Sequence, residues 1–186
     1  QLVALTTFSD LVMKARGRVR KDAIRAGMRD NEKGINEGGT GAAAYADAVA
    51  TYLAFGIGRS TDFWSSFTTW TPSGEFIGHT FVRQALPMVW DYAEGNPFSN
   101  ASGNWSGAID WIVRVIQELP YRASGNSRQL DAITFDSSDL STELVIGTDP
   151  PYYDNIGYAD LSDYFYVWLR DSIGKIYSDL FSTMLA

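Results

Sequence analysis

Apolar residues recur along this chain with two different spacings, and that change limits its possible folds more than any other feature. Before residue 120 they recur every three or four positions in four stretches, which predicts helices. These stretches are Leu2–Met28, Ala43–Gly56, Phe81–Glu94 and a segment that Asn104 or Ser106 caps and Pro120 ends. After residue 125 the segments Gln129–Phe135 and Thr142–Thr148 are short, β-branched and apolar, which predicts two strands. A last helical pattern covers Leu161–Leu185 and is weakened at Gly174.

The order of these elements predicts the α/β fold class. We expect residues 1–125 to be mainly helical and residues 126–186 to form a strand–strand–helix unit. Between the first two helices, Asp30–Gly41 is rich in Gly and Asn and predicts a loop. Asp62–Thr71 is aromatic and β-branched, which predicts a strand or extended segment.

The composition excludes several kinds of site. The chain has 186 residues, no Cys and one His, so disulfides, Cys nucleophiles and thiolate metal sites are excluded, and a His-based zinc site is not expected. Residues 1–37 hold eight of the 15 basic and five of the 22 acidic side chains, a net charge of +3 that leaves −10 for the rest. The acidic majority argues against wrapping of nucleic acid. The basic segment Lys14–Lys33 either contacts phosphates locally or is a solvated helix face.

Nothing in the sequence indicates a membrane. The longest apolar run, Ala42–Gly58, contains Asp47 and is too short and too polar to span a bilayer. No basic stretch followed by an apolar leader precedes it, so we expect a cytoplasmic protein. The chain begins at Gln1 rather than Met, so we expect a fragment of a longer protein.

The sharpest chemical signal is the tetrapeptide Asp149-Pro150-Pro151-Tyr152, directly after the second predicted strand. In an open α/β sheet, ligands bind beyond the carboxyl ends of the strands. Two consecutive prolines cannot continue a strand ladder and restrict the residues before them, so they form a stiff corner between an acid and an aromatic ring. The alternative is a turn that ends the strand and exposes the aspartate.

The tetrapeptide resembles the Asp-Pro-Pro-Tyr motif of S-adenosylmethionine-dependent amino-methyltransferases, which methylate the exocyclic nitrogen of adenine or cytosine in DNA. Thr148–Leu169 and Phe81–Phe98 resemble stretches of a large prokaryotic adenine-specific DNA methylase family that often carries a zinc ribbon elsewhere. Leu2–Val12 and Asn104–Trp111 resemble it too, so the likeness covers most of the chain. It implies a partial Rossmann-like methyltransferase sheet after a largely helical insertion, with DNA as the partner of the parent protein.

The resemblance also implies roles for the motif. The Asp149 carboxylate and the Pro150 carbonyl would accept the N–H groups of the target amine, with Pro151 completing the stiff corner. Tyr152 would stack on a base that has been rotated out of the duplex.

Further site residues are less specific. Tyr153, Asp154 and Asn155 would line the substrate pocket, although a solvated turn explains them equally well. Asp136 would contact the adenine of S-adenosylmethionine, and a cap at the end of a strand is an equal alternative. For His79 we expect a surface or packing residue rather than a general base.

One family feature is missing from the chain. The glycine-rich turn that holds the cofactor, of the type Phe-x-Gly-x-Gly after a strand, is absent. Gly56-Ile57-Gly58 follows an Ala-rich helix and predicts a helix end. We therefore expect most of the S-adenosylmethionine site to lie outside this chain, and the isolated chain to be inactive.

Two other functions stay open at this point. The same amino-methyl transfer can act on RNA or on a protein side chain, because the tetrapeptide suits any planar amine. A non-catalytic module that binds nucleic acid or protein is an alternative of a different class. A partial sheet exposes strand edges and an apolar face, so self-association is also expected.

Overall fold

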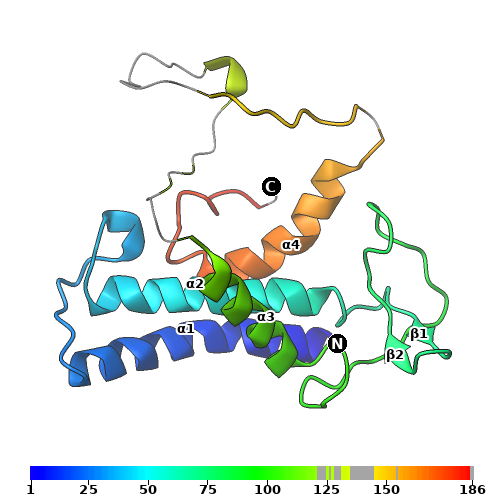
Figure 1. Ribbon diagram of the computed structural model, residues 1–186, viewed down its shortest axis with the longest axis horizontal. Helices are drawn as coiled ribbons and strands as arrows, with labels where there is room; N and C mark the ends of the chain where they lie inside the picture. Colours follow the sequence, from blue (N-terminus) through cyan, green and yellow to red (C-terminus); the bar gives the residue numbers. More distant parts are fainter. Residues whose placement is uncertain (121–124, 126, 128–130, 135–144, 154, 185–186) are drawn as a thin grey trace.

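The computed structural model describes residues 1–120, 125, 127, 131–134, 145–153 and 155–184 (Figure 1). In chain order its elements are α1 (Leu2–Arg25), η1 (Ile35–Glu37), α2 (Ala42–Thr61), β1 (Trp70–Thr71), β2 (Phe76–Ile77), α3 (Trp105–Glu118), η2 (Ala132–Thr134) and α4 (Tyr158–Ile173). Strands β1 and β2 form an antiparallel pair. The described chain is therefore mixed, mostly helical with one two-stranded sheet, and agrees with the predicted class only at this coarse level.

The core lies where α1, α2 and α4 meet. Helices α1 and α2 run side by side in opposite directions, and α4 packs against both (Figure 1). Helix α2 buries many small residues, namely Ala42, Ala43, Ala44, Ala46, Ala50 and Ala54. Because alanine adds little bulk, the neighbouring helices approach α2 closely. Larger buried side chains, including Leu5 and Val12 of α1 and Ile173 of α4, fill the remaining space.

The prediction of a helix end at Gly56-Ile57-Gly58 is wrong, because α2 continues to Thr61. Gly56 is buried, and a Cβ atom there would lie 2.9 Å from Cδ1 of Ile109 and 3.2 Å from the Trp105 ring of α3. The glycine therefore serves helix packing: it makes room for α3 to cross α2.

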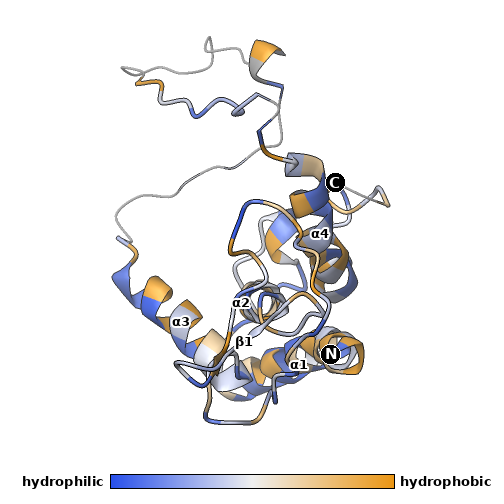
Figure 2. Cartoon of the chain, turned by 90° about the vertical axis from the view of Figure 1, so that its right-hand side faces the viewer, coloured by the Kyte–Doolittle hydropathy of each residue, from blue (hydrophilic) through white to orange (hydrophobic). Residues whose placement is uncertain are grey.

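Helix α3 begins and ends as its sequence predicts. The Asn104 side chain accepts a hydrogen bond from the Gly107 N–H at 2.6 Å, and the helix ends at Glu118 before Pro120. Only Ala108 is fully buried among the residues of this helix. Viewed from the side, α3 projects away from the α1–α2–α4 body (Figure 2).

The predicted helix over Phe81–Glu94 is wrong, because this stretch is irregular. Pro87 lacks an N–H group and disfavours helical backbone at the residue before it. The segment is held instead by hydrogen bonds to distant backbone and side-chain groups: the Ala93 N–H donates to the Thr68 carbonyl at 3.1 Å, and the Phe81 N–H donates to Asp62 Oδ1 at 3.2 Å. Large apolar side chains in it, such as Trp90, remain exposed.

The predicted strands after residue 125 do not form in the residues that the structure describes. Ala132–Thr134 make a turn of 3-10 helix, and Val145–Thr148 are irregular and exposed; the other residues of these two segments lie outside the description. A strand forms only where a neighbouring strand accepts and donates its backbone hydrogen bonds, and the described part of the chain provides no such neighbour here. Between Asp62 and Thr71 only Trp70–Thr71 is a strand.

Helix α4 is shorter than its apolar pattern, ending at Ile173 instead of continuing to Leu185. Gly174, the residue at which the pattern weakens, ends the helix, and turns follow it. Leu180, which the pattern placed on the apolar stripe, is exposed. Among the helices described, none is both long and apolar enough to cross a lipid bilayer.

A buried carboxylate joins α1, α2 and the loop between them. Arg16 of α1 donates its Nε–H to Asp47 of α2, whose side chain is only 2% exposed. The second oxygen of Asp47 accepts the N–H of Ile35 at 2.9 Å. Asp30 has a similar role at the other end of the loop, accepting Arg20 Nε–H at 2.7 Å and the N–H of Ala43 at 3.3 Å.

Replacing Asp47 with Asn should cost about 3 kcal/mol of unfolding free energy, because Arg16 then loses its counter-charge in a largely buried site. The cost lies at the lower end of the usual range because the Arg16 side chain is 28% exposed and so keeps part of its hydration. Urea unfolding measures this cost. Asp22→Asn is the matched control, since Asp22 makes exposed pairs with Arg18 and Arg25 worth less than about 1 kcal/mol. Equal costs for the two variants would contradict the structural role of Asp47.

Asp30 should make stability depend on pH in the acid range. The hydrogen bond from Arg20 is the main cause that lowers the pKa of Asp30 below its ordinary value of 3.8. The resulting stabilisation is complete above that ordinary value and is lost as the pH falls through the lowered value of the folded state. Asp30→Asn should therefore lower the urea midpoint of unfolding at pH 7. It should also make the urea midpoint fall less steeply below pH 4. Asp110→Asn, at an exposed site, is the control and should change neither. Parallel pH profiles for wild type and Asp30→Asn would contradict this.

Candidate functional site

The tetrapeptide Asp149–Tyr152 lies in an exposed segment just before α4. In Figure 1 the described residues 145–153 run apart from the helical body, and α4 connects them to it. The Tyr152 N–H donates to the hydroxyl of Tyr158, the first residue of α4, at 3.3 Å. The Asn155 N–H donates to the Tyr152 carbonyl at 3.3 Å. The loop is thus tied to the first turn of a helix that is packed into the core.

The side chains of this loop face solvent. Asp149, Pro150 and Pro151 are exposed, and the Tyr152 ring is 53% exposed. Tyr153 adopts a φ of +55°, the left-handed conformation that non-glycine residues rarely take, and its side chain is also exposed. The strained residue reverses the chain between the tetrapeptide and α4. A carboxylate, a carbonyl and an aromatic ring are therefore accessible to a ligand.

The structure brings together only part of the predicted site. Asp149, Pro150, Pro151, Tyr152, Tyr153 and Asn155 share one loop. Asp154 and Asp136 lie outside the described residues. The described residues do not fit S-adenosylmethionine by themselves, because the loop side chains are exposed and the sequence has no glycine-rich turn to hold the cofactor. The exposed carboxylate of Asp149 and the Pro150 carbonyl are hydrogen-bond acceptors, which is the kind of group that a planar amine requires.

Sequence spacing did not reveal the partner of His79. Its Nδ1 lies 2.6 Å from Oδ2 of Asp62, and its ring centroid lies 4.7 Å from that of Phe63. The Asp62 carbonyl also accepts the Thr80 N–H and hydroxyl at 2.8 and 2.9 Å. Asp62 and His79 are 17 positions apart in the sequence, and the β1–β2 hairpin lies between them. The pair pins the segment after this hairpin to the end of α2, which agrees with the expected surface or packing role.

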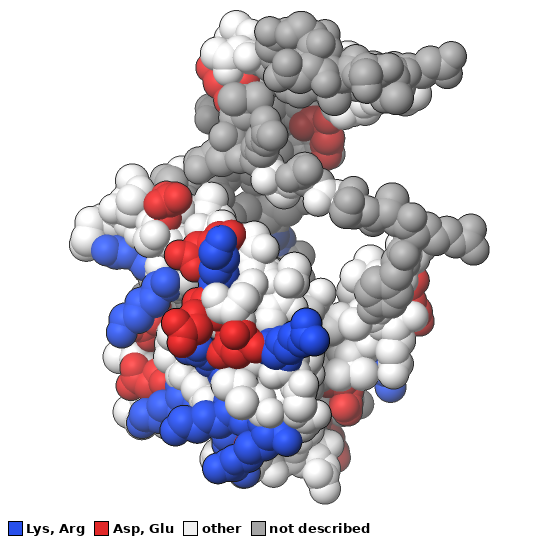
Figure 3. Space-filling model, turned by 90° about the vertical axis from the view of Figure 1, so that its left-hand side faces the viewer, with Lys and Arg blue, Asp and Glu red and all other residues white. Residues whose placement is uncertain are grey.

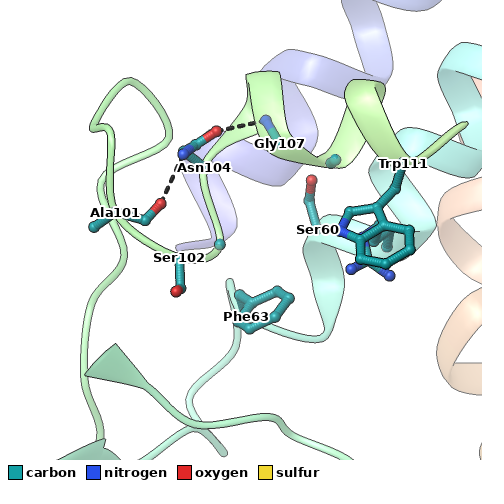
Figure 4. A pocket seen from close by; sticks show the side chains of 10 residues that line it. Ser60, Phe63, Ala101, Ser102, Asn104, Gly107 and Trp111 are labelled. Atoms are coloured by element: carbon teal, nitrogen blue, oxygen red, sulfur yellow. Dashed lines mark hydrogen bonds between the residues drawn. The ribbon is translucent and has the colours of Figure 1, made fainter. Parts of the chain in front are cut away.

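A small hollow lies between the end of α2 and the start of α3 (Figure 4). Its volume is about 190 Å³, and Phe63, Ser102 and Trp111 are among the residues that line it. The Arg59 guanidinium lies 4.9 Å from the centroid of the Trp111 ring, a cation–π contact. The Asn104 amide is already used, since it caps α3 and donates to the Ala101 carbonyl at 2.7 Å. We assign no chemistry to this hollow.

Much of the basic segment Lys14–Lys33 is paired with acids. Arg16 and Arg20 bond Asp47 and Asp30, and Arg18 lies 3.7 Å from Asp22. Figure 3 shows basic and acidic side chains next to one another on this face. Arg16 and Arg20 are therefore committed to carboxylates of the fold. Among the described residues, no group of three or more His, Cys, Asp or Glu side chains is placed to hold a metal ion.

Comparison of the chain with protein-family profiles, curated proteins and solved structures gave no match.

The 186-residue chain alone should not bind S-adenosylmethionine with micromolar affinity. The reason is that it lacks the glycine-rich turn and exposes the side chains of its loop. Isothermal titration calorimetry with the purified chain measures this. A dissociation constant in the micromolar range would show that the chain contains a complete S-adenosylmethionine site and would contradict this prediction.

Proposed function

We propose that this chain is part of an S-adenosylmethionine-dependent adenine-N6 DNA methyltransferase and carries its catalytic loop. The observation that supports this most is the display of Asp149–Tyr152 at the surface, on a loop tied to the first turn of α4. Functional residues are commonly found on loops that a rigid scaffold positions. Here the scaffold is α4, which packs against both α1 and α2.

The proposed role of Asp149 follows from the chemistry of aromatic amines. Such an amine is a poor nucleophile because its lone pair is delocalised into the ring. Acceptors on both N–H groups favour tetrahedral geometry at nitrogen and localise the lone pair. The Asp149 carboxylate and the Pro150 carbonyl are two such acceptors on adjacent residues, and the carboxylate also stabilises the positive charge that develops on nitrogen.

Tyr152 supplies the contact that holds the base. A base must leave the duplex before its amine can reach a protein loop, and an exposed aromatic ring gives it a face for stacking. The ring of Tyr152 is about half exposed, so this face is accessible. Its backbone N–H donates to the Tyr158 hydroxyl, which ties this residue to the first turn of α4.

The methyl donor is the part of the proposal that this chain does not supply. The residues for its binding would come from other segments of a longer protein. The tetrapeptide also suits the amine of an RNA base or a protein amide. Competition between these acceptors and an adenine-containing DNA duplex at equal concentration, with a labelled methyl donor and the longer protein, distinguishes them.

In the longer protein, Asp149→Ala should lower kcat about 10²–10³-fold, comparable to the loss of one oxyanion-hole donor, because the acceptor matters most as the amine becomes tetrahedral. Single-turnover transfer of a labelled methyl group to DNA measures this effect. Asp160→Ala is the matched control, since Asp160 is an exposed carboxylate in the first turn of α4. If Asp149→Ala turned over at a rate near wild type, the tetrapeptide would be a structural turn and the proposed catalytic role would be wrong.

Tyr152→Ala should weaken DNA binding as well as turnover, because base stacking on an aromatic ring contributes roughly 1–3 kcal/mol. Tyr152→Phe keeps the ring and should retain most of the activity. Tyr45→Ala is the control, since this α2 tyrosine is 50% exposed, close to Tyr152. Fluorescence of 2-aminopurine at the target position reports base extrusion, and an unchanged signal with Tyr152→Ala would exclude the stacking role.

A further inference from the structure

A hollow lies between the β1–β2 hairpin and the irregular segment 82–89. It is lined by residues on both sides of the hairpin, among them Thr69 and His79, and by most of the segment 82–89, including Arg83. Its volume is about 390 Å³, within the range of roughly 300–1,000 Å³ that small-molecule sites occupy. We call it the Arg83 hollow. None of the residues that line it belongs to the loop Asp149–Tyr152, and nothing below depends on the proposed methyltransferase function.

The wall beside the hairpin is fixed by hydrogen bonds. Thr80 is only 1% exposed. Its hydroxyl lies 2.7 Å from the Ser65 hydroxyl and donates to the Asp62 carbonyl at 2.9 Å. The Gly78 N–H donates to the Thr69 carbonyl at 2.8 Å, which joins the two sides of the hairpin. This wall is therefore in place before any ligand binds.

The opposite wall, the segment 82–89, is anchored at the residues that flank it. On one side, the Phe81 N–H donates to Asp62 Oδ1 at 3.2 Å, and the Phe81 ring centroid lies 5.0 Å from that of Tyr164 in α4. On the other side, the Ala93 N–H donates to the Thr68 carbonyl at 3.1 Å. The segment is thus held across the hollow although it forms no helix.

This segment contributes apolar surface that the described chain leaves uncovered. Val82 is 79% exposed, Leu86 is 42% exposed and Met88 is 83% exposed, and all three line the hollow. Covering such a patch with a ligand gains free energy, because apolar surface is then removed from water. A ligand that suits the hollow therefore has an apolar part.

Arg83 gives the hollow its charge. No other Lys, Arg, Asp or Glu side chain is among the described residues that line it. The Arg83 side chain is exposed and has no hydrogen bond or ion pair in the described chain. Asp62 contacts a lining residue but does not itself line the hollow: its Oδ2 lies 2.6 Å from His79 Nδ1, and its Oδ1 accepts the Phe81 N–H. Both oxygens of that carboxylate are engaged, so the charge available to a ligand is that of Arg83.

We propose that the Arg83 hollow binds a medium-chain carboxylate, with the alkyl chain against the apolar side chains of segment 82–89 and the carboxylate on the Arg83 guanidinium. The guanidinium has paired N–H donors whose geometry matches a carboxylate. One cation compensates one negative charge, so a carboxylate suits the hollow better than a phosphate dianion, whose second charge would have no partner. Arg83 would repel a cation, and a neutral ligand would not use it.

Octanoate and octanamide provide the decisive comparison, because they share the alkyl chain and a planar head group and differ in charge. Calorimetry with the whole 186-residue chain at pH 7 should give about fivefold tighter binding for octanoate, the gain expected from a charge-assisted pair at an exposed site. Acetate, which lacks the chain, should bind much more weakly than octanoate.

Three outcomes would overturn the proposal. Equal affinities for octanoate and octanamide would show an apolar hollow without anion recognition. Equal affinities for acetate and octanoate would show a contact with the carboxylate alone. Absence of octanoate binding at millimolar concentration would show that the hollow does not bind this class of ligand.

Variants at Arg83 then locate the carboxylate. Arg83→Gln removes the charge, so octanoate affinity should fall about fivefold, to that of octanamide, while octanamide affinity stays unchanged. Arg29→Gln is the matched control, since Arg29 is an exposed arginine after the end of α1, and it should change neither affinity. Unchanged octanoate affinity in Arg83→Gln would place the carboxylate elsewhere and contradict the proposal.

A variant at Leu86 locates the alkyl chain. Leu86→Ser should weaken octanoate and octanamide alike, by about threefold, because both ligands use the same apolar surface. Leu11→Ser is the control, since this α1 leucine is 44% exposed, close to the 42% of Leu86. Circular dichroism checks the folding of each variant. If Leu86→Ser bound both ligands as tightly as wild type, the chain would lie outside the hollow and the proposal would be wrong.

Discussion

Close packing around α2 is the constraint on which the rest of this structure depends. Helices α1, α3 and α4 and the turn η1 all pack against α2. Its buried face is mainly alanine, with Gly56 at the crossing with α3. Small side chains let helix backbones approach closely, so many weak dispersion contacts form over a short distance. The same closeness leaves little room for larger side chains, so most of the bulky core residues are contributed by α1, α4 and the turn after α2.

This packing determines what the exposed parts of the molecule can do. Helix α4 is held by α1 and α2, and its first turn holds the tetrapeptide loop through Tyr158. The turn after α2 places Asp62, which positions His79, and the buried Trp64, one of the residues beside a hollow next to α1 and α4. Two separate surfaces thus depend on one helical core. One presents acceptors and a ring to solvent, and the other is a hollow that aromatic residues line in part.

Some of the charged side chains in the N-terminal segment hold the fold together through ion pairs. When only the sequence is considered, the N-terminal excess of Lys and Arg fits either a phosphate-binding face or a solvated helix face. In the folded chain, Arg16 and Arg20 are used to hold the loop between α1 and α2 through Asp47 and Asp30. A cation committed to a buried or half-buried carboxylate gains little by exchanging it for a phosphate, because the carboxylate would then lose its partner. The net charge of a segment therefore does not show how well it binds phosphate when acidic side chains from elsewhere in the chain pair with its cations.

The sequence by itself determined the features that depend on neighbouring residues. Asn104 caps α3 because its side chain reaches an N–H three positions later, and Gly174 ends α4 because glycine is a poor helix former. Only the tertiary structure decided the pairing of His79 with Asp62, the packing role of Gly56 and the irregular course of Phe81–Glu94. These depend on contacts between segments far apart in the chain, which local spacing does not encode. The same reason explains the strands expected after residue 125: an apolar, β-branched run favours extended backbone, but it becomes a strand only where another strand completes its hydrogen bonds.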